Sequence, residues 1–472
     1  RDTRGIYNSA AVLGNKRILY TYHKMHLPNY GVFDEKRYFR PGTKNEILKA
    51  RDFSFSVNIC EDIWSSGDLT AEGLDFLVNI SSSPYYLGKI KERQDLLRER
   101  ARRFKIPIVY CNLIGGQDEL IFDGRSTVFS NKGEIAAVGK AFQEDLLIVD
   151  LPIDRKRKSA RGKKIKAVTI PYKIKEKKKT LSRPKVKDMP RLEEVYSALM
   201  LGVRDYVRKN NFKKVTLGLS GGIDSALVAC VAVDALGRAN VLALSLPSRY
   251  SSKATQDDAE RISKKLGIRF TRIPIDDIFD AYRKSLDTHF TGMDPDVTEE
   301  NIQARIRGNI LMAFSNKFGY LVLNTGNKSE TSVGYCTLYG DMAGGFAAIK
   351  DVPKNLVYEL AEYINTKKGK GIIPKSVFKR PPSAELRPGQ RDDDTLPSYE
   401  LLDKLIDLYI EKDRSLNDIV KKIGDKDVVK RVLRMIDMNE YKRRQSPPGI
   451  KITPRAFGKD RRMPITNKFR EA

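Results

Sequence analysis

A cysteine and a lysine lie where buried strands are expected to end. Cys60 directly follows an apolar run at residues 53–59, and Lys24 follows another at residues 17–22. A strand end can present a side chain to a cleft. A thiolate nucleophile needs a nearby cation, which lowers its pKa and stabilises the charge that develops during attack on a carbonyl. The pair is therefore a candidate for nucleophilic catalysis, although a free cysteine taken alone is more often a core residue.

A second candidate site lies between an expected strand at residues 213–219 and an expected helix at residues 224–236. The junction reads Ser220-Gly221-Gly222-Ile223-Asp224-Ser225. Glycines here let backbone N–H groups approach a pyrophosphate at the positive end of the helix, and the two serine hydroxyls add donors. Asp224 can reach a Mg²⁺ that bridges the phosphates. The junction lacks the GK[ST] of the Walker-type loop, so it predicts a different kind of pyrophosphate loop.

A third group of polar residues lies on a predicted helix at residues 299–318. Asn301, Arg305 and Asn309 are spaced i, i+4 and i+8, which places them on one face. Such a face suits an anionic ligand. A salt-bridged surface is the usual explanation when residues of this kind stand alone.

The elements that must position these residues predict two α/β regions. In the first 150 residues we expect a helix at 89–104 and strands at 17–22, 53–59, 76–80 and 106–113. Beyond residue 190, helices at 224–236, 255–266 and 299–318 alternate with strands at 213–219, 241–246, 268–274 and 320–324. This alternation predicts a parallel sheet that binds its ligand at the carboxyl ends of the strands.

Composition narrows the class of protein. The chain has 472 residues, 40% hydrophobic and 31% charged, and no apolar run near the roughly 20 residues that cross a bilayer. At roughly 150 residues per domain, we expect two to four domains. The four cysteines and three histidines show no CxxC or HxxxH spacing. This pattern argues against a zinc site and a disulfide framework and favours the cytoplasm.

The basic charge is concentrated in two segments. Of the formal net charge of +27, most comes from residues 154–188, with sixteen Lys and Arg against three acids, and from residues 442–472, with ten against two. Like-charge blocks of this kind are usually solvated or act as interaction tails. We expect a solvated linker at 154–189 and a basic tail at 442–472, with a polyanion-binding patch as the alternative.

The first half resembles a known family. The motifs HKxxLPNYxxFxExRxF, from His23, and NICEDIW, from Asn58, are similar to those of nitrilase-type amidases, in the version fused to NAD synthetases as a glutaminase. The resemblance implies an αββα sandwich with Lys24 as the catalytic lysine and Cys60 as the nucleophile. It also implies an additional acid, Glu35, and a glutamine pocket lined by Tyr30, Glu61, Ser83 and Lys89.

The second half resembles the partner in that fusion. SGGxDS is similar to the loop of ATP pyrophosphatases, and ENIQARIRGN, TGNKSE, YGD and SAELRPG follow in the order and spacing of NAD synthetases. The resemblance implies a Rossmann-like domain that binds ATP through Ser220, Gly221, Gly222, Asp224, Ser225, Thr325 and Lys354. It implies Mg²⁺ at Asp224, Glu330 and Ser383. The deamido-NAD substrate would contact Asn301, Arg305, Arg307 and Asp341.

Together the two resemblances imply ATP-dependent amidation of nicotinic acid adenine dinucleotide to NAD, with ammonia from glutamine and with AMP and pyrophosphate as products. The expected organisation is a glutaminase domain at 1–153, a linker at 154–189, a synthetase domain at 190–441 and a tail at 442–472. A cytoplasmic homo-oligomer without membrane or nucleic-acid partners is implied. The alternative is a tRNA-modifying ATP pyrophosphatase whose basic segments bind RNA.

The resemblance also predicts which nitrogen source the chain uses. The family's general-base glutamate lies upstream of the lysine, but residues 1–23 contain a single carboxylate, Asp2, without the surrounding motif. General base catalysis contributes about 100- to 10,000-fold. We therefore expect a polypeptide of these 472 residues to make NAD from ammonia but hardly from glutamine. We also expect an added upstream segment that carries the glutamate to restore glutamine use. Robust glutamine-dependent synthesis by these residues, lost in Cys60→Ala, would contradict this expectation.

Overall fold

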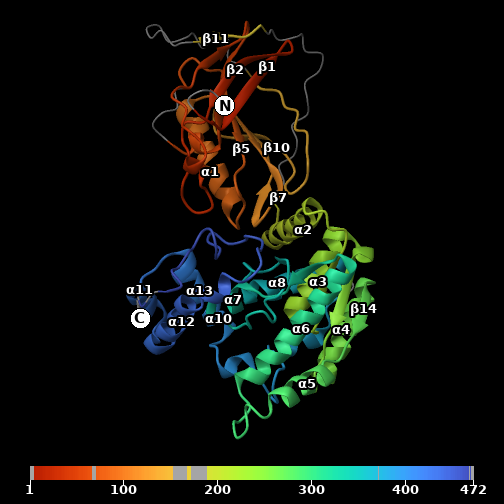
Figure 1. Cartoon of the computed structure of the whole chain (residues 1–472). Coiled ribbons are helices and arrows are strands. Elements are labelled where there is room, and N and C mark those ends of the chain that lie inside the picture. Colours follow the sequence, from red (N-terminus) through yellow and green to blue (C-terminus); the bar gives the residue numbers. More distant parts are fainter. Residues whose placement is uncertain are drawn as a thin grey trace. The chain divides into compact units, whose positions relative to one another are not determined.

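The computed structural model describes residues 5–65, 71–152, 167–171, 189–369, 371–466 and 468. The chain forms two compact units (Figure 1). Unit 1 comprises residues 1–115 and 122–189, and unit 2 comprises residues 116–121 and 190–472. Among the residues described, no helix is long and apolar enough to cross a membrane.

Unit 1 is built on a mixed sheet of seven strands in the order β10-β9-β6-β5-β4-β3-β11. The central strands β4, β5 and β6 are parallel, and β3 and β9 pair with them antiparallel. A hairpin of β1 and β2 forms a separate sheet. Strands β7 and β8 form another, and their residues 116, 117, 120 and 121 belong to unit 2. The strands are β1 (Ser9–Gly14), β2 (Arg17–His23), β3 (Ile47–Lys49), β4 (Ser54–Ile59), β5 (Phe76–Ser81), β6 (Ile108–Asn112), β7 (Ile114–Gln117), β8 (Leu120–Asp123), β9 (Thr127–Phe129), β10 (Ile135–Val138) and β11 (Ala167–Thr169).

One helix, α1 (Lys89–Phe104), lies alongside this sheet (Figure 1). Its buried residues include Leu97 and Ala101, which are spaced i and i+4 and pack with Leu77 and Ile108 of the sheet. This spacing makes one apolar stripe on the helix, as the sequence predicts. On another part of the core, Ala10 of the β1–β2 hairpin packs with residues of β4. The predicted strands and helix of the first 150 residues are confirmed.

Unit 2 contains a parallel sheet of five strands in the order β14-β13-β12-β15-β16. These strands are β12 (Val215–Gly218), β13 (Val241–Ser245), β14 (Arg269–Arg272), β15 (Leu321–Asn324) and β16 (Phe346–Ala347). The chain order reverses between the neighbours β12 and β15, and a ligand of such a sheet binds at this switch point. The predicted parallel sheet is confirmed, and its carboxyl edge at β12 and β15 is where a site is expected.

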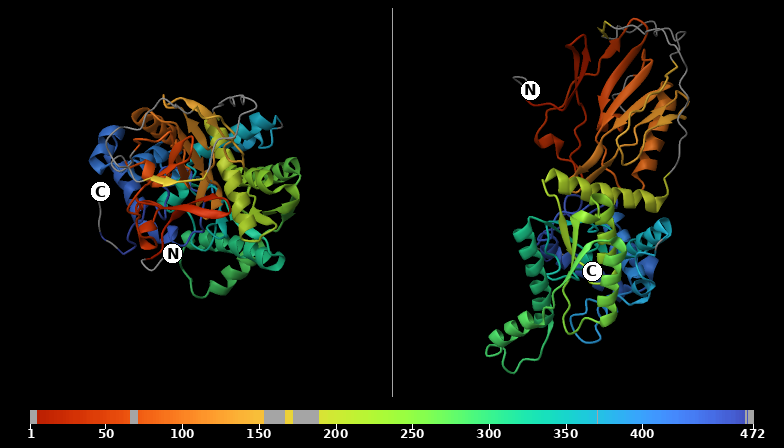
Figure 2. Two further views of the ribbon diagram at one scale, coloured as in Figure 1. Left: turned by 90° about the horizontal axis from the view of Figure 1, so that it is seen from above. Right: turned by 90° about the vertical axis from the view of Figure 1, so that its right-hand side faces the viewer.

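Helices lie on both sides of the strands of unit 2 in the right-hand view of Figure 2. The α-helices described in unit 2 are α2 (Arg191–Lys209), α3 (Ile223–Leu236), α4 (Lys253–Leu266), α5 (Asp276–Leu286), α6 (Val297–Phe318), α7 (Lys328–Val333), α8 (Lys354–Lys368), α9 (Lys375–Lys379), α10 (Tyr399–Ile406), α11 (Leu416–Ile423), α12 (Lys426–Met438) and α13 (Glu440–Arg443). Leu242 and Leu244 of β13 pack with residues of α5 and α6. Leu405, Ile419 and Val432 belong to a second core formed by the last helices.

The basic segments differ from the expectation drawn from their charge. Most of the predicted linker lies outside the described residues, and its residues 167–169 form the strand β11. The expected solvation of the C-terminal segment is wrong for residues 449–453, which are buried. Ile450 and Ile452 are fully buried, and Asp351 accepts hydrogen bonds from the N–H groups of Ile452 and Thr453. The apolar residues between the charges decide this packing, because burying them removes apolar surface from water.

A buried lysine joins this segment to the rest of unit 2. The side chain of Lys328 is inaccessible to solvent, and its ammonium lies 3.0 Å from Asp351 Oδ1 and 2.8 Å from Glu411 Oε1. It also donates to Thr453 Oγ1 and to the carbonyl oxygen of Arg455. Two carboxylates and two neutral acceptors therefore surround a single buried cation.

We expect Lys328→Met to destabilise unit 2 by about 3 to 5 kcal/mol, because the variant leaves Asp351 and Glu411 as uncompensated buried charges. Urea unfolding followed by circular dichroism measures the loss. Lys412→Met is the matched control, since Lys412 pairs with Asp407 at the surface, where both side chains are exposed. The control should change stability by about 1 kcal/mol or less. Equal stability of the two variants would contradict the structural role of Lys328.

Candidate functional site

Cys60 lies at the carboxyl end of β4, where the chain turns into the short helix η2 (Cys60–Ile63). Its backbone has a φ of +46°, in the left-handed region. For a residue other than glycine such a conformation costs of order 1–3 kcal/mol and persists only where the surroundings enforce it. The side chain is nearly buried, with 8% exposure. The predicted nucleophile therefore lies on a strained turn at a strand end.

Lys24 is the cation next to this thiol. It is 1% exposed and its Nζ donates to Glu35 Oε1 at 2.6 Å. Burial raises the pKa of Cys60, while the Lys24 ammonium and a hydrogen bond with Ser81 lower it. The other oxygen of Glu35 is buried and has no hydrogen-bond partner among the residues that the structure describes. Lys24, Glu35 and Cys60 thus form one electrostatic group.

Of the four residues predicted to line a glutamine pocket, two contact each other and the other two have different partners. Tyr30 Oη donates to Glu61 at 3.0 Å. Ser83 is buried, and its N–H donates to Asn112. Lys89 Nζ lies 3.0 Å from Glu92 and 4.0 Å from the centre of the Trp64 ring.

Electrostatics relates this group to the thiol. Burial is the main cause that lowers the pKa of Lys89 and the main cause that raises the pKa of Tyr30. Both groups also interact with the charge of Cys60. Tyr30 and Glu61 offer a hydroxyl and a carboxylate, and Lys89 offers a cation. An amino acid, which carries both charges, is a suitable ligand for such a set.

In unit 2, the predicted pyrophosphate loop joins β12 to α3. Gly221 has a φ of +89°, and a Cβ at this position would lie 2.1 Å from the carbonyl oxygen of Thr255, so only glycine fits. The N–H of Gly222 donates to Ser220 Oγ at 3.2 Å, and Ser225 Oγ donates to the carbonyl oxygen of Gly222 at 3.0 Å. The first turn of α3 begins here, so its free N–H groups and positive end lie at the loop.

Asp224, in that first turn, belongs to a group of charges from three helices. Lys354 Nζ lies 2.5 Å from Asp224 Oδ2 and 3.1 Å from Glu330 Oε1. Asn327 Nδ2 donates to the other oxygen of Asp224 at 2.8 Å. Burial, together with the charges of Asp224 and Asp392, raises the pKa of Glu330 to about 7, and Lys354 opposes this rise. Lys354 therefore lies between the two carboxylates, and its positive charge stabilises their ionised forms.

The residues predicted to hold Mg²⁺ are only partly brought together. Asp224 and Glu330 share Lys354, whereas Ser383 is exposed and donates to the carbonyl oxygen of Gln390 at 2.5 Å. Within the described part of the chain, no group of three or more His, Cys, Asp or Glu is placed to hold a metal ion. Mg²⁺ commonly binds through one or two carboxylates plus substrate phosphates, so Asp224 and Glu330 still fit it.

The residues predicted to contact the dinucleotide lie on α6 and the loop after α7. Asn301 Oδ1 accepts from Thr337 Oγ1 at 2.7 Å, and Asp341 Oδ1 accepts from the Thr337 N–H at 2.6 Å. Arg305 is exposed and donates to Leu338 O at 3.3 Å. The structure therefore places Asn301, Arg305 and Asp341 around one short loop.

Two other predicted residues lie at the carboxyl ends of strands. Arg307 donates to Leu246 O at 2.9 Å, just past β13, and burial lowers its pKa to about 10. Its spacing of two residues from Arg305 places it on a different side of α6 from Asn301 and Arg305. Thr325 directly follows β15, the parallel neighbour of β12. Because parallel strands end at the same edge, Thr325 lies at the edge that carries Ser220.

Several residues that support the loop are not among those predicted from the sequence. Asn327 holds Asp224, and Glu385 accepts from Thr255 Oγ1 at 2.9 Å. Arg380 donates to the carbonyl oxygen of Gly221 at 3.4 Å and to Asp258 at 2.5 Å. Asn327 and Glu385 lie inside the motifs TGNKSE and SAELRPG, so those motifs could have indicated that the two residues belong to the site. Arg380 and Asp258 have no such signal in the sequence.

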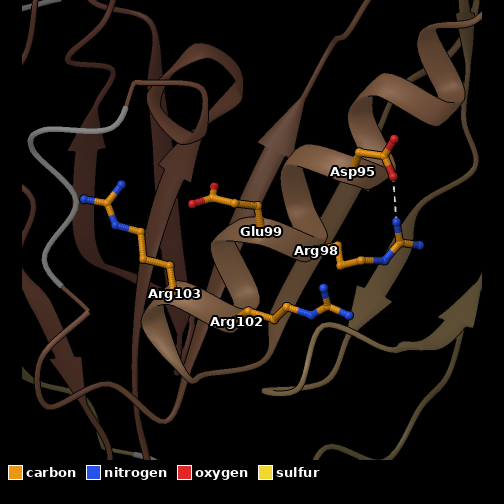
Figure 3. Close-up of a pocket in the computed structure, with 5 residues that line it drawn as sticks. All are labelled: Asp95, Arg98, Glu99, Arg102 and Arg103. Carbon is orange, nitrogen blue, oxygen red and sulfur yellow. Dashed lines mark hydrogen bonds and ion pairs between the residues drawn. The ribbon is translucent and has the colours of Figure 1, made fainter.

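A shallow pocket on α1 does not coincide with the site. Figure 3 shows that its lining side chains project from one side of this helix. They are Asp95, Arg98, Glu99, Arg102 and Arg103. Arg98 and Asp95 form an ion pair at 2.6 Å. None of the residues considered above for chemistry lines this pocket, and we assign it no role.

Comparison with protein families divides the chain in a similar way. Residues 1–161 match the carbon-nitrogen hydrolase family, and residues 195–446 match the NAD synthase family. The glutamine-dependent NAD(+) synthetase of Thermotoga maritima is 49% identical over 98% of this chain and 83% of its own length. That of Aquifex aeolicus is also 49% identical, over 98% of this chain and 84% of its own length. This chain belongs to the glutamine-dependent NAD(+) synthetases.

A solved structure of the same family supports this membership. The glutamine-dependent NAD(+) synthetase of Acinetobacter baumannii, in complex with adenosine diphosphate, is 43% identical and has a TM-score of 0.70. The alignment covers 98% of this chain and 82% of that one. The resemblance stated from the motifs is confirmed, as is the fold class of a nitrilase-like domain followed by an NAD synthetase domain. The alternative of a tRNA-modifying ATP pyrophosphatase is not favoured.

We expect Lys24→Met to slow alkylation of Cys60. Burial raises the pKa of this thiol and Lys24 lowers it, so loss of the ammonium raises the pKa further and reduces the thiolate fraction at a given pH. When the pKa of the thiol rises by one unit, the alkylation rate at a pH below that pKa falls about tenfold. The rate constant with iodoacetamide, followed across pH by mass spectrometry of the Cys60 peptide, measures this change. Lys44→Met, which removes an exposed lysine paired with Glu46, is the control and should leave the profile unchanged. An unchanged profile for Lys24→Met would contradict the coupling.

Proposed function

We propose that this chain makes NAD(+) by ATP-dependent amidation of nicotinic acid adenine dinucleotide, with ammonia that glutamine supplies where the family's general-base glutamate is present. AMP and pyrophosphate are the other products. The observation that carries this proposal is the buried Lys354 between the partly buried Asp224 and Glu330, beside the Ser220–Ser225 loop. The same chain also carries Cys60 with Lys24. Family membership supports the reaction, and the geometry supports the roles of individual residues.

In the glutaminase half, Cys60 would lose its proton and its thiolate would attack the side-chain carbonyl carbon of glutamine. The C–N bond then breaks, the nitrogen takes up the proton that the thiol lost and leaves as ammonia, and water hydrolyses the thioester to glutamate and the free thiol. Lys24 would stabilise the negative charge of the tetrahedral intermediate, and Glu35 would hold the ammonium in place. By charge, Glu61 suits the α-ammonium of glutamine and Lys89 suits its α-carboxylate. Tyr30 and Ser83 complete the proposed pocket.

In the synthetase half, the loop at Ser220 to Ser225 would bind the phosphates of ATP through backbone N–H groups and hydroxyls. The substrate carboxylate attacks the α-phosphorus and displaces pyrophosphate, and ammonia then displaces AMP from the acyl adenylate. Lys354 would stabilise the charge on the phosphates. Asp224 and Glu330 would hold Mg²⁺, which neutralises the charge that accumulates on pyrophosphate. Ser383 can join them only if a ligand brings its loop closer.

The remaining proposals concern substrate contacts and organisation. Asn301, Arg305 and Asp341 surround one loop and offer an amide, a cation and a carboxylate to the dinucleotide, with Arg307 and Thr325 at the strand ends. We also propose the domain boundaries stated from the sequence, a homo-oligomer and a cytoplasmic location. The free state of all four cysteines agrees with a reducing compartment.

We expect Asp224→Ala to abolish AMP formation with either ammonia or glutamine, because the variant removes a carboxylate from the proposed metal and Lys354. Loss of a ligand or its support commonly costs tenfold or more. AMP release with ammonia as the nitrogen source is the measurement. Asp277→Ala, which removes an exposed carboxylate from the first turn of α5, is the control and should keep full activity. Near-normal ammonia-dependent synthesis by Asp224→Ala would refute the assignment.

A further inference from the structure

One buried carboxylate touches both segments that carry the proposed glutaminase residues. Asp62 is 2% exposed and lies in η2, two residues after Cys60. Its Oδ1 accepts from the N–H groups of Met25 and His26, at 3.1 and 2.8 Å. Its Oδ2 accepts from Tyr22 Oη at 2.8 Å and from the N–H of Ile59 at 2.9 Å. The carboxylate therefore has four hydrogen-bond donors.

The positions of these donors in the chain show which two segments Asp62 connects. Tyr22 precedes Lys24 by two residues, and Met25 and His26 follow it directly, so three of the donors flank the lysine. The fourth, the N–H of Ile59, belongs to the residue just before Cys60. The Asp62 side chain thus joins the Lys24 segment, at the end of β2, to the strained turn that carries the proposed nucleophile.

We propose that Asp62 is a positioning residue that fixes the Lys24 ammonium against the Cys60 thiol. This role rests on the glutaminase function proposed above. Asp62 acts through its hydrogen bonds to the backbone and to Tyr22, and takes no part in the reaction itself. Its bond to the Ile59 N–H also supports the positive φ of Cys60, since the surroundings must enforce that conformation.

A carboxylate is required at this position. Two ionised oxygens offer about four acceptor sites, which matches the four donors, whereas an amide has only one accepting oxygen. Asp62→Asn keeps the size of the side chain and leaves donors of the Lys24 segment or of Ile59 without an acceptor. A buried donor without an acceptor is costly, so the two segments would separate or rearrange. The ammonium would then lie less well placed against the thiol.

The pH profile of Cys60 reports on this arrangement, because several charged or titratable groups act on the thiol. They are Lys24, Glu35 and Glu61 near the turn, with Tyr30, Lys89, Arg93 and Tyr110 from other elements. Asp62 reaches the thiol through the position of Lys24. A variant of Asp62 should therefore shift the profile in the same direction as Lys24→Met.

The experiment measures the rate constant for alkylation of Cys60 by iodoacetamide across pH in the full chain. We expect Lys24→Met to slow the reaction about tenfold at pH 8 and Asp62→Asn to slow it several-fold, with both profiles moved to higher pH. Asp75→Asn is the matched control. Asp75 is a carboxylate at the start of β5 that accepts from the N–H and the hydroxyl of Ser54, at the other end of β4. It should leave the profile of Cys60 unchanged.

The variants separate the possible outcomes. A wild-type profile for Asp62→Asn beside a shifted profile for Lys24→Met would overturn the role of Asp62. An unshifted Lys24→Met would overturn the proposed function of Lys24, and the role of Asp62 with it. If Asp62→Asn does not fold, Tyr22→Phe decides, because it removes one donor and keeps the ring. A shift in the direction of Lys24→Met supports the role, and a wild-type profile overturns it.

Discussion

A lysine removed from water must have carboxylates beside it, because an isolated ammonium in a protein interior is too costly to keep charged. Lys24 meets Glu35, Lys328 meets Asp351 and Glu411, and Lys354 meets Asp224 and Glu330. In each case the partners come from separate segments of the chain. The charge requirement therefore determines which loops and helices must come together, and the sites of both units depend on it.

The same requirement connects stability with chemistry. Asn327, the N-cap of α7, donates a hydrogen bond to Asp224. The next residue, Lys328, anchors the C-terminal segment. The start of α7 therefore supports both the candidate site and the core. Around Cys60 the balance is different, since burial disfavours the thiolate while Lys24 favours it. A small displacement of the lysine would change that balance. This is why the hydrogen bonds of Asp62 carry functional weight in our proposal.

Both candidate sites lie at the carboxyl ends of strands. In unit 1 the proposed nucleophile follows β4, a central parallel strand. In unit 2 the proposed pyrophosphate loop follows β12, next to β15 at the switch point of the sheet. The carboxyl ends of parallel strands form one edge, so residues distant in sequence meet there. Two sheets of different topology thus use the same means of presenting polar side chains.

The sequence by itself determined the strands, the main helices and the positions of Cys60, Lys24 and the Ser220–Ser225 loop, because local periodicity and turn chemistry act over a few residues. Only the tertiary structure decided the partners of buried charges. It placed Lys354 between two carboxylates, brought Arg307 to the carbonyl oxygen of Leu246, and directed the Ser383 hydroxyl to that of Gln390. It also buried residues 449–453 of the basic C-terminal segment, whose charge predicted solvation. Such pairings join residues that are far apart in the chain, and their energy depends on burial, which no short stretch of sequence contains.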